Sequence, residues 1–285
     1  MIQAFSVNDG GLVRELEFPA ATSYGYDRCY SQRCTLAELR VADFEYPYAV
    51  YVHRHDVRVL ARSAQKAVDV MDMHGVDAEV VVGDMTDAGA VSAAVAGCDA
   101  VIHAAAAIGV AVTSAEDVGV VNVTGARNVL GAAVEAGLDP IVYTSSVSVH
   151  LPATTPTLTV DTPLAEPMSP YGASKRAIEL LVRDLVAEGA PITTFVISGV
   201  YGPVSPTLDN SFAAILAALE SMMVTPPGGA NVVDVRDLAR MLATAAVQPG
   251  RGARRYVSGG HFVTWADWVA ALERAAGRPV PSLPM

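Results

Sequence analysis

The chain has 285 residues, of which 52% are hydrophobic and 17% are charged. This composition excludes an intrinsically disordered protein, which needs low hydrophobicity and high charge. The net charge of −11 argues against nucleic acid or an anionic bilayer as a partner. The longest apolar run, DAVIHAAAAIGVAV, falls short of the roughly 20 apolar residues of a membrane span.

The cysteines and histidines argue against a disulfide framework and against a metal site. Three cysteines are too few and too irregularly spaced for either, and the six histidines form no HExxH pattern. The opening MIQAFSVNDGG has neither the basic flank nor the apolar core of a secretory signal. We therefore expect reduced thiols, a cytoplasmic location and no metal.

The first 55 residues do not fit the pattern of the rest. A dinucleotide-binding sheet is expected to open with a strand and a glycine-rich turn. The chain instead has glycine at 10, 11 and 25, and then none until Gly75. We interpret 1–55 as an atypical N-terminal segment that lacks the phosphate-binding loop.

From residue 56 the sequence alternates short apolar runs with longer runs of helical character. Strands are predicted over 56–61, 78–83, 99–106, 140–146 and 192–198, and helices over 114–136 and 170–188. Buried parallel strands have such short β-branched runs. The alternation predicts an α/β fold with a doubly wound, mostly parallel sheet, Rossmann-like, over 56–200.

After residue 200 prolines and glycines become frequent, which favours loops. We predict a small C-terminal lobe over 201–285 that covers the substrate. It contains a helix at about 236–247, which packs back on the Rossmann-like domain, and another at about 265–276. The lobe is apolar, which favours a hydrophobic substrate over a sugar nucleotide, although core packing explains the same residues equally well.

Tyr171 and Lys175 are the strongest candidates for catalysis. A spacing of four places both side chains on one face of the predicted helix. A cation near a phenol favours the phenolate and lowers its pKa towards the working range of an acid/base catalyst. The alternative is an ordinary i, i+4 pair on a helix surface.

The residues TSSVS (144–148) lie at the carboxyl end of a predicted strand, where open α/β sheets bind ligands. A hydroxyl there can hydrogen-bond a substrate oxygen. The alternative is a serine/threonine turn that satisfies its own backbone.

Seven motifs in order give the chain a family resemblance: GDMTD, HAAA, VNVTGARNVLGAA, VYTSSVSV, SPYGASK, SGVYGP and VVDVRDLA. Together they resemble the extended short-chain dehydrogenase/reductase superfamily, and within it the NAD-dependent epimerase/dehydratase group, including dihydroflavonol-reductase-like and 3β-hydroxysteroid-dehydrogenase-like members. The resemblance implies that Tyr171 is the general acid/base, that Lys175 binds the nicotinamide ribose and that Ser146 binds the substrate oxygen. Thr144 is also placed at the cofactor, with Tyr171 and Lys175.

The resemblance implies further cofactor contacts. Asp84 and Met85 would contact adenine, and Gly199 and Val200 would border the nicotinamide. Three small residues would pass beside the ribose and the pyrophosphate: Ala104, Ala105 and Ala106. Asn122 would have a partly structural role, and VVDVRDLA is equally compatible with a helix cap and with a binding role.

The choice between NAD and NADP depends on the residue that ends the second strand of the family fold, which corresponds to the predicted strand over 56–61. An acidic residue there would bind the ribose hydroxyls and repel a 2′-phosphate. The end of this strand reads VRVLARS, with Arg62 and Ser63 and no carboxylate, and a guanidinium suits a phosphate. The sequence therefore favours NADP slightly over NAD, unless Arg62 is simply a solvated loop residue.

These observations predict an NAD(P)-dependent oxidoreductase or epimerase that acts on a small carbonyl or alcohol substrate. The family resemblance also suggests a homodimer. The alternative is a catalytically inactive or cofactor-binding-deficient relative, acting as a scaffold or having no function, because the glycine-rich loop is missing.

Overall fold

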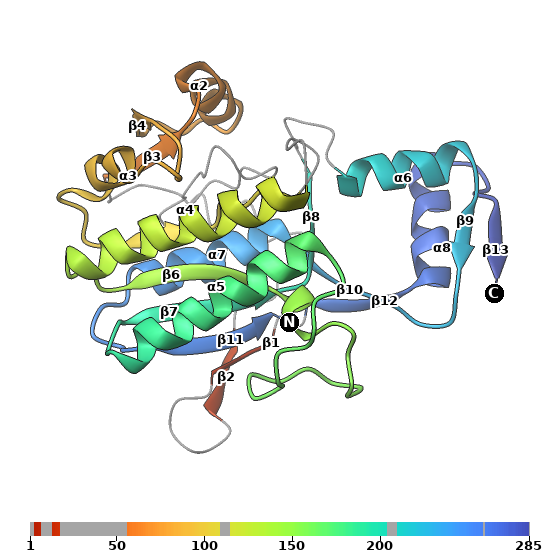
Figure 1. Cartoon of the computed structure of the whole chain (residues 1–285). Helices are drawn as coiled ribbons and strands as arrows, with labels where there is room; N and C mark the ends of the chain where they lie inside the picture. The colour runs from red at the N-terminus through yellow and green to blue at the C-terminus, as the bar shows by residue number, and fades with distance from the viewer. Residues whose placement is uncertain are drawn as a thin grey trace.

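The computed structural model describes residues 3–6, 13–17, 56–108, 115–203, 210–258 and 260–284. Of the atypical N-terminal segment, only two short strands lie within these ranges. Figure 1 shows a large sheet with helices packed on it and a separate group of elements at the C-terminal end of the chain.

The large sheet is mostly parallel, as predicted. Its strand order is β2-β1-β11-β7-β6-β5, and β11, β7, β6 and β5 run parallel to one another. The two N-terminal strands add an antiparallel ribbon at the β11 edge. The strands are β1 (Gln3–Ser6), β2 (Val13–Glu17), β5 (Val101–His103), β6 (Ile141–Ser146), β7 (Ile192–Ile197) and β11 (Arg254–Ser258).

Helices cover both faces of this sheet, which makes it doubly wound. On β6, Ile141 and Tyr143 belong to the core that α4 (Ala115–Glu135) and α5 (Pro170–Ala187) form on one face. Val142 points to the opposite face and packs with α7 (Val235–Ala246). This alternation follows from the period of two along a strand, and both faces of β6 are covered, so almost all of its residues are buried.

A second, two-stranded parallel sheet consists of β3 (Arg58–Ala61) and β4 (Glu79–Val82). The helix α2 (Ala64–Met73) joins the two strands, and α3 (Ala88–Val95) follows β4. In the usual doubly wound order one strand separates these two from β5. Among the described residues no strand occupies that position, and the sheet is divided in two.

The helices begin and end close to the residues that the sequence predicted. Ser169 caps α5 by accepting a hydrogen bond from the backbone N–H of Gly172 at 3.0 Å, and Pro170 follows as the first helical residue. The first residue of the predicted 114–136 helix, Ser114, lies outside the described residues. None of the described helices is both long and apolar enough to span a membrane.

The C-terminal part has two small sheets and its own core. A three-stranded sheet contains β8 (Gly199–Tyr201), β10 (Gly229–Asp234) and β12 (His261–Thr264). The helices α6 (Asn210–Glu220) and α8 (Trp265–Ala276) pack with β9 (Met223–Thr225), which pairs with β13 (Ser282–Pro284).

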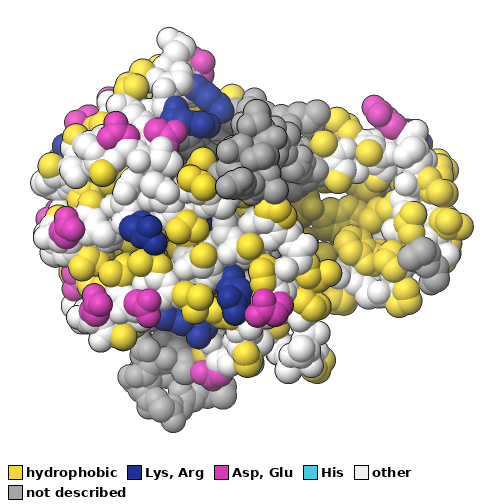
Figure 2. Space-filling model, in the orientation of Figure 1, with side chains coloured by type: hydrophobic (Ala, Val, Ile, Leu, Met, Phe, Trp, Pro, Cys, Tyr) yellow, Lys and Arg dark blue, Asp and Glu magenta, His cyan; other side chains and the backbone are white. Residues whose placement is uncertain are grey.

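Figure 2 shows a hollow lined by hydrophobic side chains between these C-terminal elements and the main body. Since β11 and α7 belong to the large sheet and its covering layer, the chain after residue 200 contributes to both parts.

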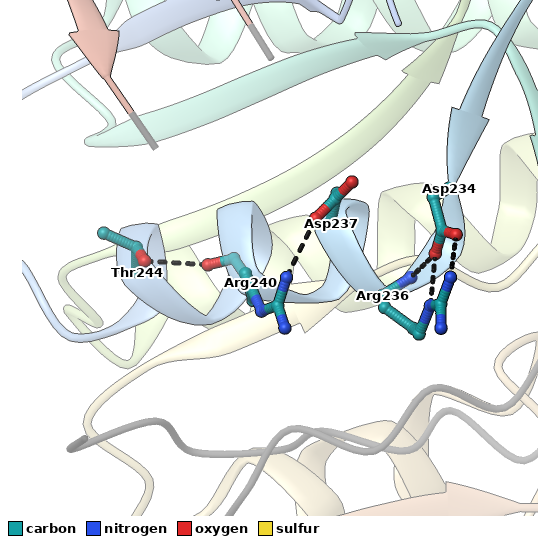
Figure 3. A network of polar contacts seen from close by, with 5 residues as sticks. All are labelled: Asp234, Arg236, Asp237, Arg240 and Thr244. Atoms are coloured by element: carbon teal, nitrogen blue, oxygen red, sulfur yellow. Dashed lines mark hydrogen bonds and ion pairs between the residues drawn. The ribbon is translucent and has the colours of Figure 1, made fainter. Parts of the chain in front are cut away.

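The VVDVRDLA segment forms the end of β10 and the start of α7 (Figure 3). Asp234 is the N-cap, and its Oδ1 accepts hydrogen bonds from the backbone N–H and the Nε of Arg236, both at 2.8 Å. Arg240 donates to Asp237 at 2.9 Å one turn further on. The segment therefore acts as a helix cap, one of the two readings that the sequence left open.

Candidate active site

Ser146, Tyr171 and Lys175 come together where β6 ends and α5 begins. The spacing of four residues puts Tyr171 and Lys175 on the same face of α5, and Lys175 Nζ lies 5.9 Å from the centre of the Tyr171 ring. Ser146 is the last residue of β6, and its side chain interacts with that of Tyr171 and lowers the pKa of the phenol. The Ser146 Oγ also accepts from the backbone N–H of Ser148 at 3.2 Å, so this serine both caps a turn and contacts the tyrosine.

Lys175 is buried, and its ammonium lies 5.3 Å from the centre of the Tyr143 ring. Only 3% of its surface is exposed, and its ammonium donates to the Thr144 carbonyl oxygen at 3.0 Å. Burial lowers the pKa of Lys175 to about 8, against the opposing effect of the Glu179 carboxylate. Thr144, which the sequence placed at the cofactor, therefore orients the lysine through its backbone.

The pKa of Tyr171 differs from the expectation. Burial raises it to about 12, and the interaction with Ser146 only partly offsets this. The Lys175 ammonium is directed at the Thr144 carbonyl rather than at the phenol, so it does not lower the tyrosine pKa here. Tyr171 is consequently a neutral phenol at pH 7, the form that can donate a proton.

A chain of hydrogen bonds fixes the start of α5 against the loop after β5. Asn122 Nδ2 donates to the Ala107 carbonyl oxygen and to Ser174 Oγ, both at 2.9 Å, and Ser174 Oγ donates to the Tyr171 carbonyl oxygen at 2.8 Å. Asn122 Oδ1 accepts from the Ala107 N–H at 2.6 Å. The partly structural role implied for Asn122 is consistent with this network, whereas Ser174 was missed although it stands within the SPYGASK motif.

Three further buried groups near the lysine were not singled out as site residues. The His103 ring stacks on Tyr143 with 5.9 Å between ring centres, and burial together with the Lys175 charge lowers the pKa of His103 to about 3. Glu179, one turn after Lys175, is fully buried and forms an ion pair with Arg255 of β11 at 2.6 Å. The sequence shows that Glu179 lies four residues after Lys175, on the same face of α5. Only the fold brings Arg255 next to this glutamate.

Arg62, Asp84 and Met85 follow the carboxyl ends of β3 and β4. Asp84 Oδ1 accepts from the N–H and hydroxyl of Thr86 at 2.8 and 2.7 Å, and Arg62 Nε lies 4.0 Å from Asp84 Oδ2. Partial burial opposes ionisation of Asp84, but the Thr86 hydrogen bonds and the Arg62 charge keep its pKa below the usual value. The Met85 side chain packs against Gly125 of α4, where an added Cβ would lie 2.5 Å from Met85 Cγ.

The remaining predicted cofactor residues lie after β5 and β7. Ala104, Ala105 and Ala106 follow β5 directly, and Ala104 is buried. Gly199 and Val200 begin β8, next to Val232 and Val233 of β10. All of these positions follow the carboxyl ends of parallel strands, where doubly wound sheets bind nucleotides.

The described residues fit part of a nicotinamide dinucleotide. Buried Lys175 makes one hydrogen bond among the described residues and has two more N–H groups, which suit ribose hydroxyls. The small residues after β5 leave room for the cofactor to approach the backbone closely. Arg62 supplies a positive charge that would bind a phosphate. No glycine-rich turn follows a strand in the part of the chain that the structure describes, so these residues supply no backbone cradle for the pyrophosphate. They also contain no cluster of three metal-ligating side chains.

The structure therefore has a doubly wound sheet with a serine, a tyrosine and a lysine at its carboxyl edge, the arrangement expected from the family resemblance. The match to a family model agrees. The chain belongs to the NAD dependent epimerase/dehydratase family, whose model matches residues 48–259. The resemblance seen in the sequence motifs is thereby confirmed.

Individual proteins support the same placement. The chain is 31% identical over 239 residues to a 2-alkyl-3-oxoalkanoate reductase of Stenotrophomonas maltophilia, covering 79% of this chain and 69% of that protein. It is 40% identical over 132 residues to human 3 beta-hydroxysteroid dehydrogenase type 7, covering 42% of this chain but only 36% of that enzyme. The fold matches UDP-glucose 4-epimerase from Bifidobacterium longum in complex with NAD+ and UDP, with a TM-score of 0.68, 21% identity and coverage of 81% and 79%.

Proposed function

We propose that the protein is an NAD(P)-dependent oxidoreductase or epimerase that acts on a small carbonyl or alcohol substrate. The observation that carries this proposal is the convergence of Ser146, Tyr171 and Lys175 at the end of β6. A bound nicotinamide dinucleotide supplies the hydride for the carbonyl carbon, or accepts the one removed from an alcohol.

Tyr171 is the proton donor in the direction of reduction. With a pKa of about 12 it holds its proton at pH 7, and the proton passes to the substrate oxygen as that oxygen gains negative charge. The Ser146 hydroxyl donates a second hydrogen bond to the same oxygen. Thr144 holds Lys175 through one hydrogen bond, and the remaining N–H groups of the lysine would bind the ribose hydroxyls. In the direction of oxidation the tyrosine takes the proton back.

We propose NADP as the preferred cofactor, with NAD as the alternative. Arg62 is the basic residue at the end of β3, and its side chain is 59% exposed, so it can turn towards a 2′-phosphate. Asp84 lies close to Arg62, and a bound phosphate would compete with it for the guanidinium. Replacing Arg62 by alanine is expected to weaken NADPH binding more than NADH binding.

The substrate class is argued from the hollow between the main body and the C-terminal elements. Hydrophobic side chains line it (Figure 2). This favours an apolar substrate over a sugar nucleotide. We also propose a homodimer formed through α4 and α5, where Val120 and Leu180 are 58% and 44% exposed.

The test is titration of the purified chain with NADPH and with NADH. Binding is expected to raise Tm with cofactor concentration. Tyr171→Phe is then expected to lose nearly all turnover while it retains NADPH affinity. A variant that keeps most of its rate would exclude the role assigned to Tyr171.

The second candidate is an inactive relative that binds no dinucleotide. The divided sheet favours it, because the strand and the glycine turn that hold the pyrophosphate are missing from the described residues. An unchanged Tm at millimolar NADPH and NADH would support this candidate and contradict the first.

A further inference from the structure

A row of paired residues crosses four strands of the large sheet beneath α5. His103 of β5 pairs with Tyr143 of β6. Thr194 of β7 pairs with Tyr143 on one side and with Arg255 of β11 on the other. Residues paired in this way point to the same face of the sheet, and Tyr143 belongs to the core on the α4 and α5 face. The row therefore brings Arg255 to the underside of the helix that carries the site.

Two charged side chains of α5 face this row. Lys175 is 3% exposed and Glu179 is fully buried, and their spacing of four places them on the same face of the helix. The Lys175 ammonium lies over the Tyr143 ring, and Glu179 Oε2 lies 2.6 Å from Arg255 Nη1. The helix and the sheet thus enclose two cations and one carboxylate.

The Glu179 carboxylate pairs with the arginine and not with the lysine. Among the described residues Arg255 is its ion-pair partner, and Lys175 donates to the Thr144 carbonyl oxygen instead. A carboxylate four residues from a lysine on a helix commonly pairs with it directly. Here the short hydrogen bond from the guanidinium holds the carboxylate in place. The ammonium has three N–H groups, so two of them are left for other partners.

The carboxylate acts on the lysine through its charge. Burial disfavours the charged form of a lysine, and a negative charge nearby favours it. Burial lowers the pKa of Lys175 to about 8, and the charge of Glu179 is what opposes a further fall.

The other titratable groups around Lys175 are neutral at pH 7. Burial lowers the pKa of His103 to about 3, and it raises the pKa of Tyr143 and of Tyr171. Burial also lowers the pKa of His150, in the short helix over Val147–His150 that packs against α5. The α4 residues in this core are apolar. Within the described residues, the carboxylate one turn further along α5 is thus the negative charge that acts on this ammonium.

We propose that Glu179 and Arg255 are positioning residues for Lys175: Arg255 holds the carboxylate in its own ion pair, so that Glu179 keeps the lysine charged without occupying its N–H groups. The consequence for cofactor binding rests on the proposed function. The arrangement of the three charges does not.

The test is the titration of Lys175 by NMR in the full chain, with lysine-selective isotope labelling. Glu179→Gln removes the charge and keeps the size of the side chain. The pKa of Lys175 is expected to fall by about one unit or more, because two unit charges about 6 Å apart interact at least this strongly inside a protein. A purely structural role predicts the opposite direction, since a loosened site admits water and returns the pKa towards 10.5.

Variants of Arg255 test its separate role. Arg255→Met frees the carboxylate to pair with the lysine and is expected to raise the pKa of Lys175, whereas Arg255→Lys keeps a cation there and is expected to stay within about half a unit of the parent value. The double variant Glu179→Leu/Arg255→Met is expected to show a fall instead of this rise. It also guards against unfolding, because apolar replacement of a buried ion pair is often neutral for stability.

Cofactor binding provides a second measurement. If the pKa of Lys175 falls by about one unit, the charged form at pH 8 falls from about half to about one tenth of the molecules. NADPH is therefore expected to bind Glu179→Gln about fivefold more weakly than the parent chain at pH 8, and almost equally at pH 6.

Glu166→Gln, which removes a carboxylate from an exposed ion pair with Arg176, is the control and is expected to leave the pKa of Lys175 unchanged. A pKa of Lys175 that stays constant or rises in Glu179→Gln and in the double variant would overturn the proposal, as would an equal fall in Glu166→Gln. The titration needs no nucleotide. It therefore decides the proposal even in a chain that binds neither NADPH nor NADH, a result that would contradict only the proposed function.

Discussion

Lys175 provides a quantitative test of the site because the chain has only two lysines. The other, Lys66, lies exposed on α2 and serves as a matched control. Burial lowers the pKa of Lys175 from 10.5 to about 8, so the unfolded chain holds this proton to a higher pH than the folded one. The folded state is therefore expected to gain stability as the pH rises from about 8 towards 10.5.

The size of the effect follows from these two values. At about 1.4 kcal/mol per pH unit, the whole shift corresponds to about 3 kcal/mol, of which about 2 kcal/mol is reached between pH 7 and pH 9.5. The measurement is urea unfolding at both pH values. Lys175→Met is expected to lack the stability gain, whereas Lys66→Met is expected to keep it.

A direct titration checks the same reasoning. With lysine-selective isotope labelling, NMR is expected to show one side chain that titrates near 8 and one near the ordinary value. Equal pH dependence of stability in the parent chain and in Lys175→Met would refute the argument, as would a Lys175 that titrates near 10.5. Either result would mean that water reaches the ammonium and that Thr144 does not hold it in a dry site.

Two further predictions concern packing around the site. Glu179→Gln leaves its buried partner Arg255 without a counter-charge and is expected to lower the free energy of unfolding by roughly 3 kcal/mol. Glu166→Gln, which breaks an exposed ion pair, is the control and should cost less than about 1 kcal/mol in the same urea experiment. Gly125→Ala places a methyl group against Met85 and is expected to cost about 1 kcal/mol net. Gly131→Ala, in open space on the same helix, should stabilise by up to about 1 kcal/mol. If Met85→Ala does not reverse the sign of the Gly125→Ala effect in a double-mutant cycle, the assigned clash is wrong.

The sequence predicted the elements of the main body well because their signals are local. The strands around 141–146 and 192–197 are buried on both faces, so their apolar runs stand out. The helix over Pro170–Ala187 has a serine cap, a proline at its first position and a glycine after its end. These features depend on neighbouring residues alone.

The expectations after residue 200 were less complete. Short strands such as β8 and β9, with three residues each, are defined by their partners more than by their own sequence. The strand over Arg254–Ser258 pairs with β7, some sixty residues earlier in the chain, and so extends the large sheet. Pairing at such a distance leaves no periodic signal within either strand.

The amino-acid order by itself determined the family, the tyrosine and lysine on one helical face, and the missing glycine turn, because each is a matter of residue identity at a fixed spacing. Only the tertiary structure decided the ionisation of the site, because a pKa depends on burial and on charges brought near by folding, as the values for Tyr171 and Lys175 show. It also decided that the described strands form a divided sheet, since strand pairing exists only once the chain has folded.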